Sequence, residues 1–276
     1  MTQIATVLIP AFNEAAMIGG TLAALDDPRL RLVVIANACT DDTADVARRA
    51  APRAIVLETA RPGKINALNI GRFCTLPDLP VVFVDADLDT TPAQIAMLLA
   101  ALDHAEAACG RMEIDTAGCS ALVRAYMRAW TLNPYFEKGK FGGLFAVSAT
   151  AAARLFPLPQ VTADDEFIRR SFAAEDIAFV PDCSFTARAP RDLATLIRVR
   201  RRALRGAHAL SGTGQRRGSG ARAMLRHALP RPQLWADLAV FVAVMALVRL
   251  QLALEPATAA TAWERDTTNR PMELHR

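Results

Sequence analysis

Short apolar runs alternate along the chain with longer segments in which apolar residues recur at helical spacing. The runs are rich in β-branched residues, as strands are, and the segments between them are rich in Ala and Leu, as helices are. The predicted strands are residues 5–10, 30–36, 54–58, 81–87 and 108–114, and the predicted helices are 14–25, 41–50 and 93–105. This alternation predicts an α/β fold, a parallel sheet with helices on both faces, whose ligands bind beyond the carboxyl ends of the strands.

Length and composition fit a globular protein. The 276 residues are 52% hydrophobic, enough for one large core or two smaller ones. The five cysteines are an odd number without a close CxxC pair, which argues against a disulfide framework or a zinc ribbon and favours a reducing cytosol. The first residues lack the basic segment of a signal peptide, so we expect the chain to begin in the cytosol.

Charge is divided unevenly along the chain. Residues 188–231 hold twelve Arg and one acid, a net charge of +11, whereas residues 1–187 hold 16 basic and 22 acidic residues, a net charge of −6. An acidic body therefore carries a basic arm. The arm has no interleaved aromatic residues and no nucleic-acid-binding motif, so we expect no nucleic-acid partner.

The sharpest chemical signal follows the predicted strand 81–87. There an apolar run leads into Asp85, Asp87 and Asp89, which places like charges close together at the exposed end of a buried strand. Carboxylate oxygens at such a position suit Mg²⁺ or Mn²⁺, although a solvated acidic loop would have the same sequence.

Three weaker motifs follow the other predicted strands. In PAFNE (10–14), Asn13 is a candidate helix cap, and the free N–H groups of the helix start favour an anion. In NACTDDT (37–43), Thr40 or Asp41 is the candidate cap. In RPGKINALN (61–69), Lys64 opposes the dipole at a helix start, which indicates an external anion beside it.

The order of these four motifs resembles the nucleotide-binding half of the family 2 glycosyltransferases, which have the GT-A fold. Two later segments, GGLFAVSATAAARLF (142–156) and TADDEFIRRSF (162–172), are similar to the family's glycine-containing segment and its acidic motif. The resemblance covers roughly residues 4–210. It implies a Rossmann-like mixed sheet flanked by helices, here with a basic helical C-terminal extension.

The resemblance also implies roles for individual residues. It places the nucleotide beside Pro10, Ala11, Asn13, Glu14, Asn37 and Lys64, the sugar or ribose beside Asp85, and a divalent metal, Mn²⁺ or Mg²⁺, on Asp87. It gives Asp89 no role. Many family members have Asp where this chain has Asn37, and because an amide both donates and accepts, GDP and dTDP sugars stay open beside UDP sugars.

Asp165 is the candidate catalytic base that would deprotonate the attacking hydroxyl. We expect its neighbours Asp164 and Glu166 to raise its pKa by like-charge repulsion. One base in a single displacement predicts inversion at the anomeric carbon. The enzyme is thus expected to move a sugar from a nucleoside-diphosphate donor to a hydroxyl on a glycan or lipid-linked glycan.

The arginine-rich segment RVRRRALR departs from the processive members of the family. Val199 and Ala203 stand where those enzymes have the Gln and Trp of their Gln-x-x-Arg-Trp motif, so transfer of one or a few sugars is expected. Arg198, Arg202 and Arg205 share a helical face that suits either the donor diphosphate or anionic lipid, with Arg202 the candidate for the diphosphate.

Residues 234–254 are strongly apolar, and three interpretations stay open: an interfacial helix, a marginal transmembrane helix, or a helix packed on protein. The basic arm before them favours an anionic membrane surface, with the enzyme cytoplasmic at that face. We divide the chain into a catalytic domain (1–190, with a nucleotide-sugar half of about 1–110 and an acceptor half of about 111–190), an arm and linker (191–232), and an apolar helix with a polar tail (233–276).

Two other classes of protein compete with the transferase. A sugar-1-phosphate nucleotidyltransferase would carry a glycine-rich basic loop after the first strand, where this chain has PAFNE. A non-catalytic nucleotide-binding module would have lost Asp87 or Asp165, and both are present. A dinucleotide-dependent oxidoreductase is disfavoured because no GxGxxG follows the first strand.

Overall fold

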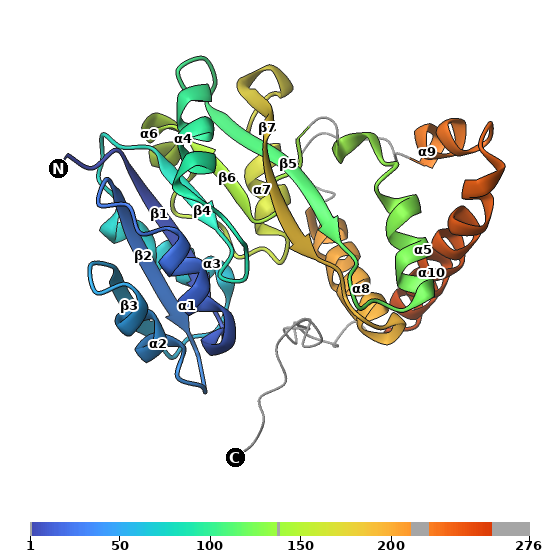
Figure 1. The fold of residues 1–276 in the computed structure, drawn as a ribbon, viewed down its shortest axis with the longest axis horizontal. Coiled ribbons are helices and arrows are strands. Elements are labelled where there is room, and N and C mark those ends of the chain that lie inside the picture. The colour runs from blue at the N-terminus through green and yellow to red at the C-terminus, as the bar shows by residue number, and fades with distance from the viewer. Residues whose placement is uncertain (1, 137–138, 211–220, 256–276) are drawn as a thin grey trace. The chain divides into compact units, whose positions relative to one another are not determined.

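The structure is a computed structural model that describes residues 2–136, 139–210 and 221–255. Its described part contains a seven-stranded sheet in the order β3-β2-β1-β4-β6-β5-β7 (Figure 1). The strands are β1 (Ala5–Ala11), β2 (Leu30–Asn37), β3 (Ile55–Thr59), β4 (Val81–Val84), β5 (Ala107–Asp115), β6 (Leu144–Val147) and β7 (Ile177–Arg188). The chain forms two compact units, Met1–Met112 with Gly139–Thr186, and Glu113–Lys138 with Ala187–Arg276.

The first four strands form the parallel half of the sheet. β1 pairs with β2 from Ala5↔Leu30 to Ala11↔Ala36, and with β4 on its other side from Thr6↔Val81. The carboxyl ends of β1, β2 and β4 therefore lie at one edge of the sheet. The motifs PAFNE and NACTDDT and the acidic stretch lie at these strand ends. Each predicted strand of this half matches an observed one, but β4 ends at Val84, so the acidic stretch leaves the sheet earlier than predicted.

The second half of the sheet is antiparallel. β6 runs against β4 from Val81↔Val147 to Val84↔Leu144, and against β5 from Ala107↔Val147. The all-parallel sheet expected from the strand–helix alternation is therefore wrong, whereas the mixed sheet that the family resemblance implies is confirmed. The alternation rule fails here because the sequence pattern does not predict two strands of this half, β6 and β7.

Helices cover both faces of the sheet in the first unit. They are α1 (Ala15–Ala24), α2 (Thr43–Ala50), α3 (Lys64–Gly71), α4 (Pro92–Ala101), α6 (Ala149–Leu155) and α7 (Asp164–Arg170). Side chains alternate along each strand, so Leu8 and Phe83 pack with Leu68 of α3 and Ile168 of α7 in one apolar cluster. Phe83 stacks on Phe145 of β6 at 4.6 Å between ring centroids. On the other face, α1 and α2 lie side by side.

The second unit is helical. Its helices are α5 (Ala121–Trp130), α8 (Leu193–Ala209), α9 (Ala221–Ala228) and α10 (Trp235–Leu254). The inner face of α10 packs along α5 and α8, and Tyr126 stacks on Phe241 with 5.0 Å between ring centroids. Within the described residues, Pro232–Leu254 is the single helix that is long and apolar enough to cross a membrane by length and composition.

The bounds of the compact units differ from those of the domains predicted from sequence, since α5 packs with the C-terminal helices α8 and α10. The functional division at 190 and 232 stays a prediction. The part of the polar tail after residue 255, and the linker at 211–220, lie outside the described residues.

Two glycines give opposite predictions for stability. A Cβ on Gly110 of β5 would lie 2.1 Å from the carbonyl oxygen of Cys183, whereas a Cβ on Gly20 of α1 would meet nothing within 4 Å. We expect Gly110→Ala to lower the free energy of unfolding by about 2 kcal/mol or more. Gly20→Ala should raise it by about 0.5–1 kcal/mol, because alanine is the better helix former.

Urea denaturation followed by circular dichroism measures both changes. Equal stability of the two variants would mean that β5 and β7 are not in contact at Gly110.

Candidate active site

The end of β4 places the acidic stretch at the edge of the sheet. Asp85 directly follows the strand, and its N–H donates to the carbonyl oxygen of Gly143 at 2.8 Å. Gly143 has φ +98°, and a Cβ there would lie 2.7 Å from Oδ2 of Asp85. Position 143 therefore favours glycine for two reasons, its backbone conformation and its closeness to the carboxylate.

Lys64 links two segments that carry carboxylates. It is the first residue of α3, and its Nζ lies 2.7 Å from Oδ1 of Asp85 and 3.0 Å from Oδ2 of Asp164. The Lys64 side chain is 22% exposed and that of Asp164 11%. Two carboxylates of the protein itself therefore offset the Lys64 charge, and its place beside the nucleotide stays a prediction.

These ion pairs also decide the protonation of Lys64. Burial lowers the pKa of this ammonium group, but the charges of Asp164, Asp85 and Asp165 raise it by more, so the net shift is upward. Lys64 is therefore held as a cation. Asp85 and Asp164 are held together by it, although 79 residues of sequence separate them.

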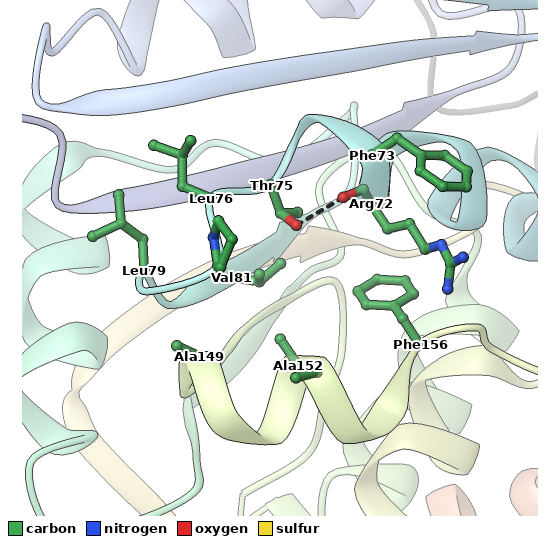
Figure 2. A pocket seen from close by; sticks show the side chains of 11 residues that line it. Arg72, Phe73, Thr75, Leu76, Leu79, Val81, Ala149, Ala152 and Phe156 are labelled. Carbon is green, nitrogen blue, oxygen red and sulfur yellow. Dashed lines mark hydrogen bonds between the residues drawn. The ribbon is translucent and has the colours of Figure 1, made fainter.

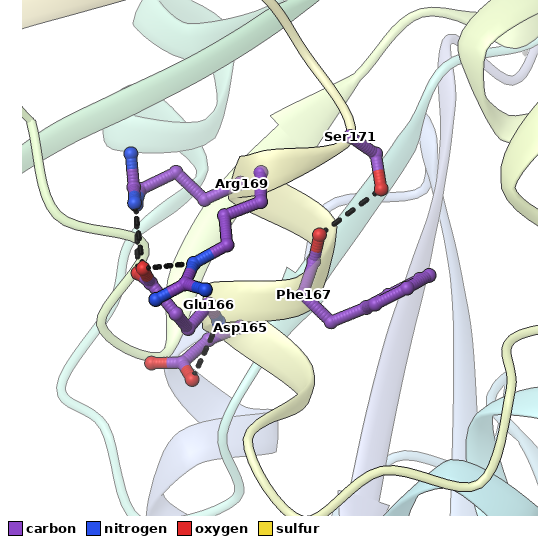
Figure 3. A network of polar contacts seen from close by, with 6 residues as sticks. Asp165, Glu166, Phe167, Arg169 and Ser171 are labelled. Carbon is purple, nitrogen blue, oxygen red and sulfur yellow. Dashed lines mark hydrogen bonds and ion pairs between the residues drawn. The ribbon is translucent and has the colours of Figure 1, made fainter. Parts of the chain in front are cut away.

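Asp165 is the second residue of α7, directly after Asp164, and its carboxylate lies beside Glu166 (Figure 3). Burial raises the pKa of Asp165 most; Lys140 lowers it, Asp164 raises it, and Lys64 lowers it. The net shift is upward. An elevated pKa in a group close to other ionisable residues is typical of a general base.

Glu166 acts differently from the prediction. Its carboxylate is held by Arg169 at 2.7 and 2.8 Å and by Arg170 at 2.7 Å (Figure 3). These two guanidinium groups lower the pKa of Glu166 against the opposing effect of burial. The backbone N–H of Glu166 donates to Asp165 at 2.8 Å and so lowers the pKa of Asp165. The expectation that Glu166 raises this pKa is wrong, while the expectation for Asp164 is confirmed.

The ends of β1 and β2 carry the residues expected at the nucleotide. Pro10 and Ala11 are the last residues of β1, and Asn13 has a positive φ of 52° in the loop after it. Its side chain donates to Oγ1 of Thr40 at 3.1 Å and accepts from the Thr40 N–H at 2.7 Å. Asn13 thus ties two strand-end loops together and does not cap α1 as predicted.

The start of α1 is satisfied by the loop after β2. The Glu14 N–H donates to Oγ1 of Thr43 at 2.7 Å, and the Ala15 N–H donates to Oδ2 of Asp41 at 3.2 Å. These two donors are therefore not left for an anion, contrary to the prediction from the PAFNE motif. The cap of α2 also differs, because Asp42 occupies the cap position without a side-chain cap bond.

Asn37 closes β2 at the same edge. Asn37 is only 4% exposed, and its Oδ1 has no hydrogen-bond partner in the described part of the chain. A buried acceptor without a partner is costly, so this oxygen is suited to receive a donor from a ligand.

Arg202 lies on α8, in the second compact unit. Two residues of the arginine face predicted with it have partners within the chain: Arg205 pairs with Glu255 at 2.8 Å, and Arg198 donates to Oγ1 of Thr195 at 2.8 Å. A role of Arg202 on the diphosphate stays a prediction.

A preformed cage of protein ligands for a metal is absent from the described residues, where no group of three or more His, Cys, Asp or Glu side chains is suitably placed. Asp85 is ion-paired with Lys64, whereas Asp87, two residues further along, is exposed in the turn after β4. An exposed carboxylate fits Mg²⁺ or Mn²⁺ bound through one or two carboxylates, water and substrate phosphates. The residues present therefore fit such an ion at Asp87.

A separate cavity of about 320 Å³ lies at the opposite end of β4 (Figure 2). Val81, the first residue of β4, lines it together with Arg72, Phe73, Ala152 and Phe156. It is mainly apolar and holds none of the carboxylates described above, so it is distinct from the candidate active site.

Solved structures resemble this fold over most of its length. A mycobacterial protein is 22% identical with a TM-score of 0.57, covering 77% of this chain and 76% of that one. Glucosyl-3-phosphoglycerate synthase from Mycobacterium tuberculosis, solved with Mn²⁺, UDP and glucosyl-3-phosphoglycerate, is 20% identical with a TM-score of 0.55, covering 77% and 81%. Its complex with Mn²⁺, UDP-glucose and glycerol 3-phosphate is 21% identical with a TM-score of 0.55, covering 77% and 82%. At these identities the likeness establishes the fold, which is GT-A-like.

Residues 6–156 match the family described as Glycosyl transferase family 2, so the chain belongs to this family. It is therefore a nucleotide-sugar-dependent glycosyltransferase. No curated protein sequence matches the chain. The resemblance stated from the sequence is thereby confirmed, and the competing nucleotidyltransferase is set aside.

Two residues of the site were not among the predicted ones, Lys140, which acts on Asp165, and Gly143, which positions Asp85. The ion pair of Asp164 with Lys64 was not predicted either, although Asp164 was expected to act on Asp165. The paired glycines at 142 and 143 were a usable signal, because they precede a β-rich run. Lys140 had no such signal in the sequence.

Removal of the Lys64 charge should cost stability. We expect Lys64→Met to lower the free energy of unfolding by about 2 kcal/mol or more, because Asp85 and Asp164 would be left as uncompensated, partly buried charges. Adding Asp164→Asn should recover part of this loss. Urea melts of the two single variants and the double variant measure the coupling, and strictly additive losses would contradict the bridging role of Lys64.

Proposed function

We propose that the enzyme transfers one sugar from a nucleoside-diphosphate donor to a hydroxyl acceptor and inverts the anomeric centre. The proposal rests above all on Lys64, which joins Asp85, on the donor side of the site by family resemblance, to Asp164, the neighbour of the candidate base. Donor carboxylate and base are thereby held in one cluster.

In the proposed step the acceptor oxygen attacks the anomeric carbon while the bond from that carbon to the diphosphate oxygen breaks. The electron pair of the broken bond goes to the diphosphate, and the acceptor proton goes to a carboxylate oxygen of Asp165. The elevated pKa of Asp165 supports this role, because a stronger base takes the proton more readily. Because the acceptor attacks the anomeric carbon from the face opposite the leaving diphosphate, a single displacement inverts this centre.

The charges of the cluster support a requirement for a divalent cation. Asp85, Asp164 and Asp165 bring three negative charges against the two positive charges of Lys64 and Lys140. Asp87, two residues along the chain from Asp85, carries a further negative charge. The net negative charge of these residues would repel a diphosphate. Asp87 would hold Mn²⁺ or Mg²⁺, which supplies positive charge to the leaving diphosphate when bound.

Recognition of the donor base is assigned to the edge formed by Pro10, Ala11, Asn13, Glu14 and Asn37. The unpaired Oδ1 of Asn37 suits an N–H donor such as the imide of uracil or thymine. The M. tuberculosis synthase of similar fold was solved with UDP-glucose. A UDP sugar is therefore the first donor to test, with GDP and dTDP sugars beside it.

The acceptor is proposed to be a glycan or lipid-linked glycan at the cytoplasmic face of a membrane. The long apolar helix α10 supports a membrane-borne acceptor. Val199 and Ala203, in place of the Gln and Trp of processive enzymes, support a non-processive transfer. The fold relative was solved with the small phosphorylated compounds phosphoglyceric acid and glycerol 3-phosphate, so these belong in the acceptor screen.

A donor screen tests the proposal and its residues together. Purified protein with Mn²⁺ or Mg²⁺, UDP, GDP and dTDP sugars and the acceptor panel should release nucleoside diphosphate, and NMR of the product should show inversion. Asp165→Asn should lower kcat by about 10²–10⁴-fold without changing donor affinity. Asp87→Ala should abolish metal-dependent donor binding in calorimetry.

Asp89→Ala is the matched control, because this carboxylate is two residues from Asp87 and has no assigned role. Equal losses in the two alanine variants would contradict the metal assignment. Full turnover by Asp165→Asn would exclude Asp165 as the base.

The pH dependence of turnover follows from the environment of Asp165. The base acts deprotonated, so activity should fall as pH drops through its raised pKa, at a higher pH than an ordinary carboxyl near about 3.9 would give. Lys140 lowers this pKa, so Lys140→Met should move the acid limb of kcat/KM to still higher pH. Lys140→Arg keeps the charge and should leave the acid limb in place. An acid limb that stays at the same pH in Lys140→Met would contradict the assignment of Asp165 as the base.

A further inference from the structure

The outer face of α10 is apolar along the whole helix. Its large exposed residues are Trp235, Val242, Leu247, Leu250 and Leu254, and all but Leu247 are more than half exposed. At 100° per residue, the exposed residues of α10 fall within one arc of roughly half the helix circumference. Among them only Arg249 is charged. A face of this length and composition marks an interaction surface.

The opposite face of α10 is fixed to its own unit. Val244, Met245 and Val248 are buried, and Oη of Tyr126 lies 3.4 Å from Sδ of Met245. The buried Asp237 accepts two hydrogen bonds from Arg128 of α5, at 2.6 and 2.7 Å. The helix is therefore held along α5 and α8, and it would have to leave both to become a lone spanning helix.

The charges around α10 are arranged for an anionic partner. The acids of this segment face inward, Asp237 against Arg128 and Glu255 against Arg201 and Arg205. Within the described residues, the exposed charged side chains of α10 and of the segment that leads into it are basic: Arg249 on α10, and Arg226 and Arg231 before it. That segment also exposes Leu229, whose carbonyl accepts from Nε1 of Trp235 at 3.3 Å.

We propose that α10 lies in the plane of an anionic bilayer surface, with Leu229, Trp235, Val242, Leu247, Leu250 and Leu254 inserted among the acyl chains and Arg226, Arg231 and Arg249 on the phosphate headgroups. The proposal deepens the membrane location in the proposed function by giving the face and the mode of contact. Amphipathic helices with aromatic and basic anchors bind membranes in this way. A spanning mode is disfavoured, because it would break the Asp237–Arg128 pair or carry the arginines of α8 into the hydrocarbon.

Vesicle sedimentation of the full chain tests the surface. Phosphatidylcholine vesicles with phosphatidylglycerol should bind the protein at least about ten-fold more tightly than phosphatidylcholine alone, given several basic contacts. Leu247→Glu/Leu250→Glu should weaken binding by about ten-fold or more. Arg249→Gln should weaken only the anionic component, by about five-fold.

Phe73→Glu is the matched control, since Phe73 is an exposed aromatic residue in the other compact unit. It should leave vesicle binding unchanged. If the glutamate pair fails to fold, Trp235→Ala serves as the second variant, with an expected partial loss of binding. The proposal would be overturned if every α10 variant bound vesicles as tightly as the wild type.

Two further outcomes would also overturn it. Retention of the protein on vesicles in alkaline carbonate would show a spanning helix, whereas release supports the in-plane mode. A dimer in light scattering that the glutamate pair converts to monomers, without any vesicle binding of the wild type, would assign the face to a second copy. Donor turnover with a soluble acceptor should survive Leu247→Glu/Leu250→Glu, so failure of this surface is distinguishable from failure of the proposed reaction.

Discussion

The ion pairs of Lys64 with Asp85 and Asp164 are the interaction on which the site depends. They connect the first turn of α3, the loop after β4 and the first turn of α7. A partly buried ammonium group is unfavourable by itself, and two carboxylates close to each other are unfavourable without a cation. Each segment therefore stabilises the charges of the others, and the candidate base at Asp165 takes its position from the same arrangement.

The antiparallel strand β6 gives this cluster its geometry. The carbonyl of Gly143 receives the N–H of Asp85, so the residue before β6 fixes the direction in which the chain leaves β4. Only a residue without a side chain allows the Asp85 carboxylate so close to that backbone. The change from parallel to antiparallel pairing is thus part of the site: it brings the glycine-containing segment against the acidic stretch, which a fully parallel sheet would place differently.

The sequence predicted the parts of this structure that depend on local pattern. The strands β1, β2 and β3 and the helices α1, α2 and α4 lie within a few residues of their predicted ranges, because each is a separate apolar run or helical repeat bounded by turn residues. The expectation for Glu166 failed for a local reason, because its partners Arg169 and Arg170 lie three and four residues along the same helix. The other failures share one cause, contacts between segments distant in sequence. Asn13 bonds Thr40, Lys64 finds Asp164 a hundred residues away, and β6 pairs against β4; none of these partners is visible in the local pattern.

For α10, the average composition tells less than the positions of its polar residues. Its mean apolar character satisfies the length and composition of a spanning helix, and so does the core helix of many soluble proteins. The few polar residues decide between these alternatives, because charge in a hydrocarbon environment must be paired or reach the interface. Asp237 is paired on the buried face, and Arg249 lies on the exposed face near the helix end. One face of α10 is thus packed against protein, and the other is apolar with Arg249 near its end, which is the division that the proposed in-plane membrane contact requires.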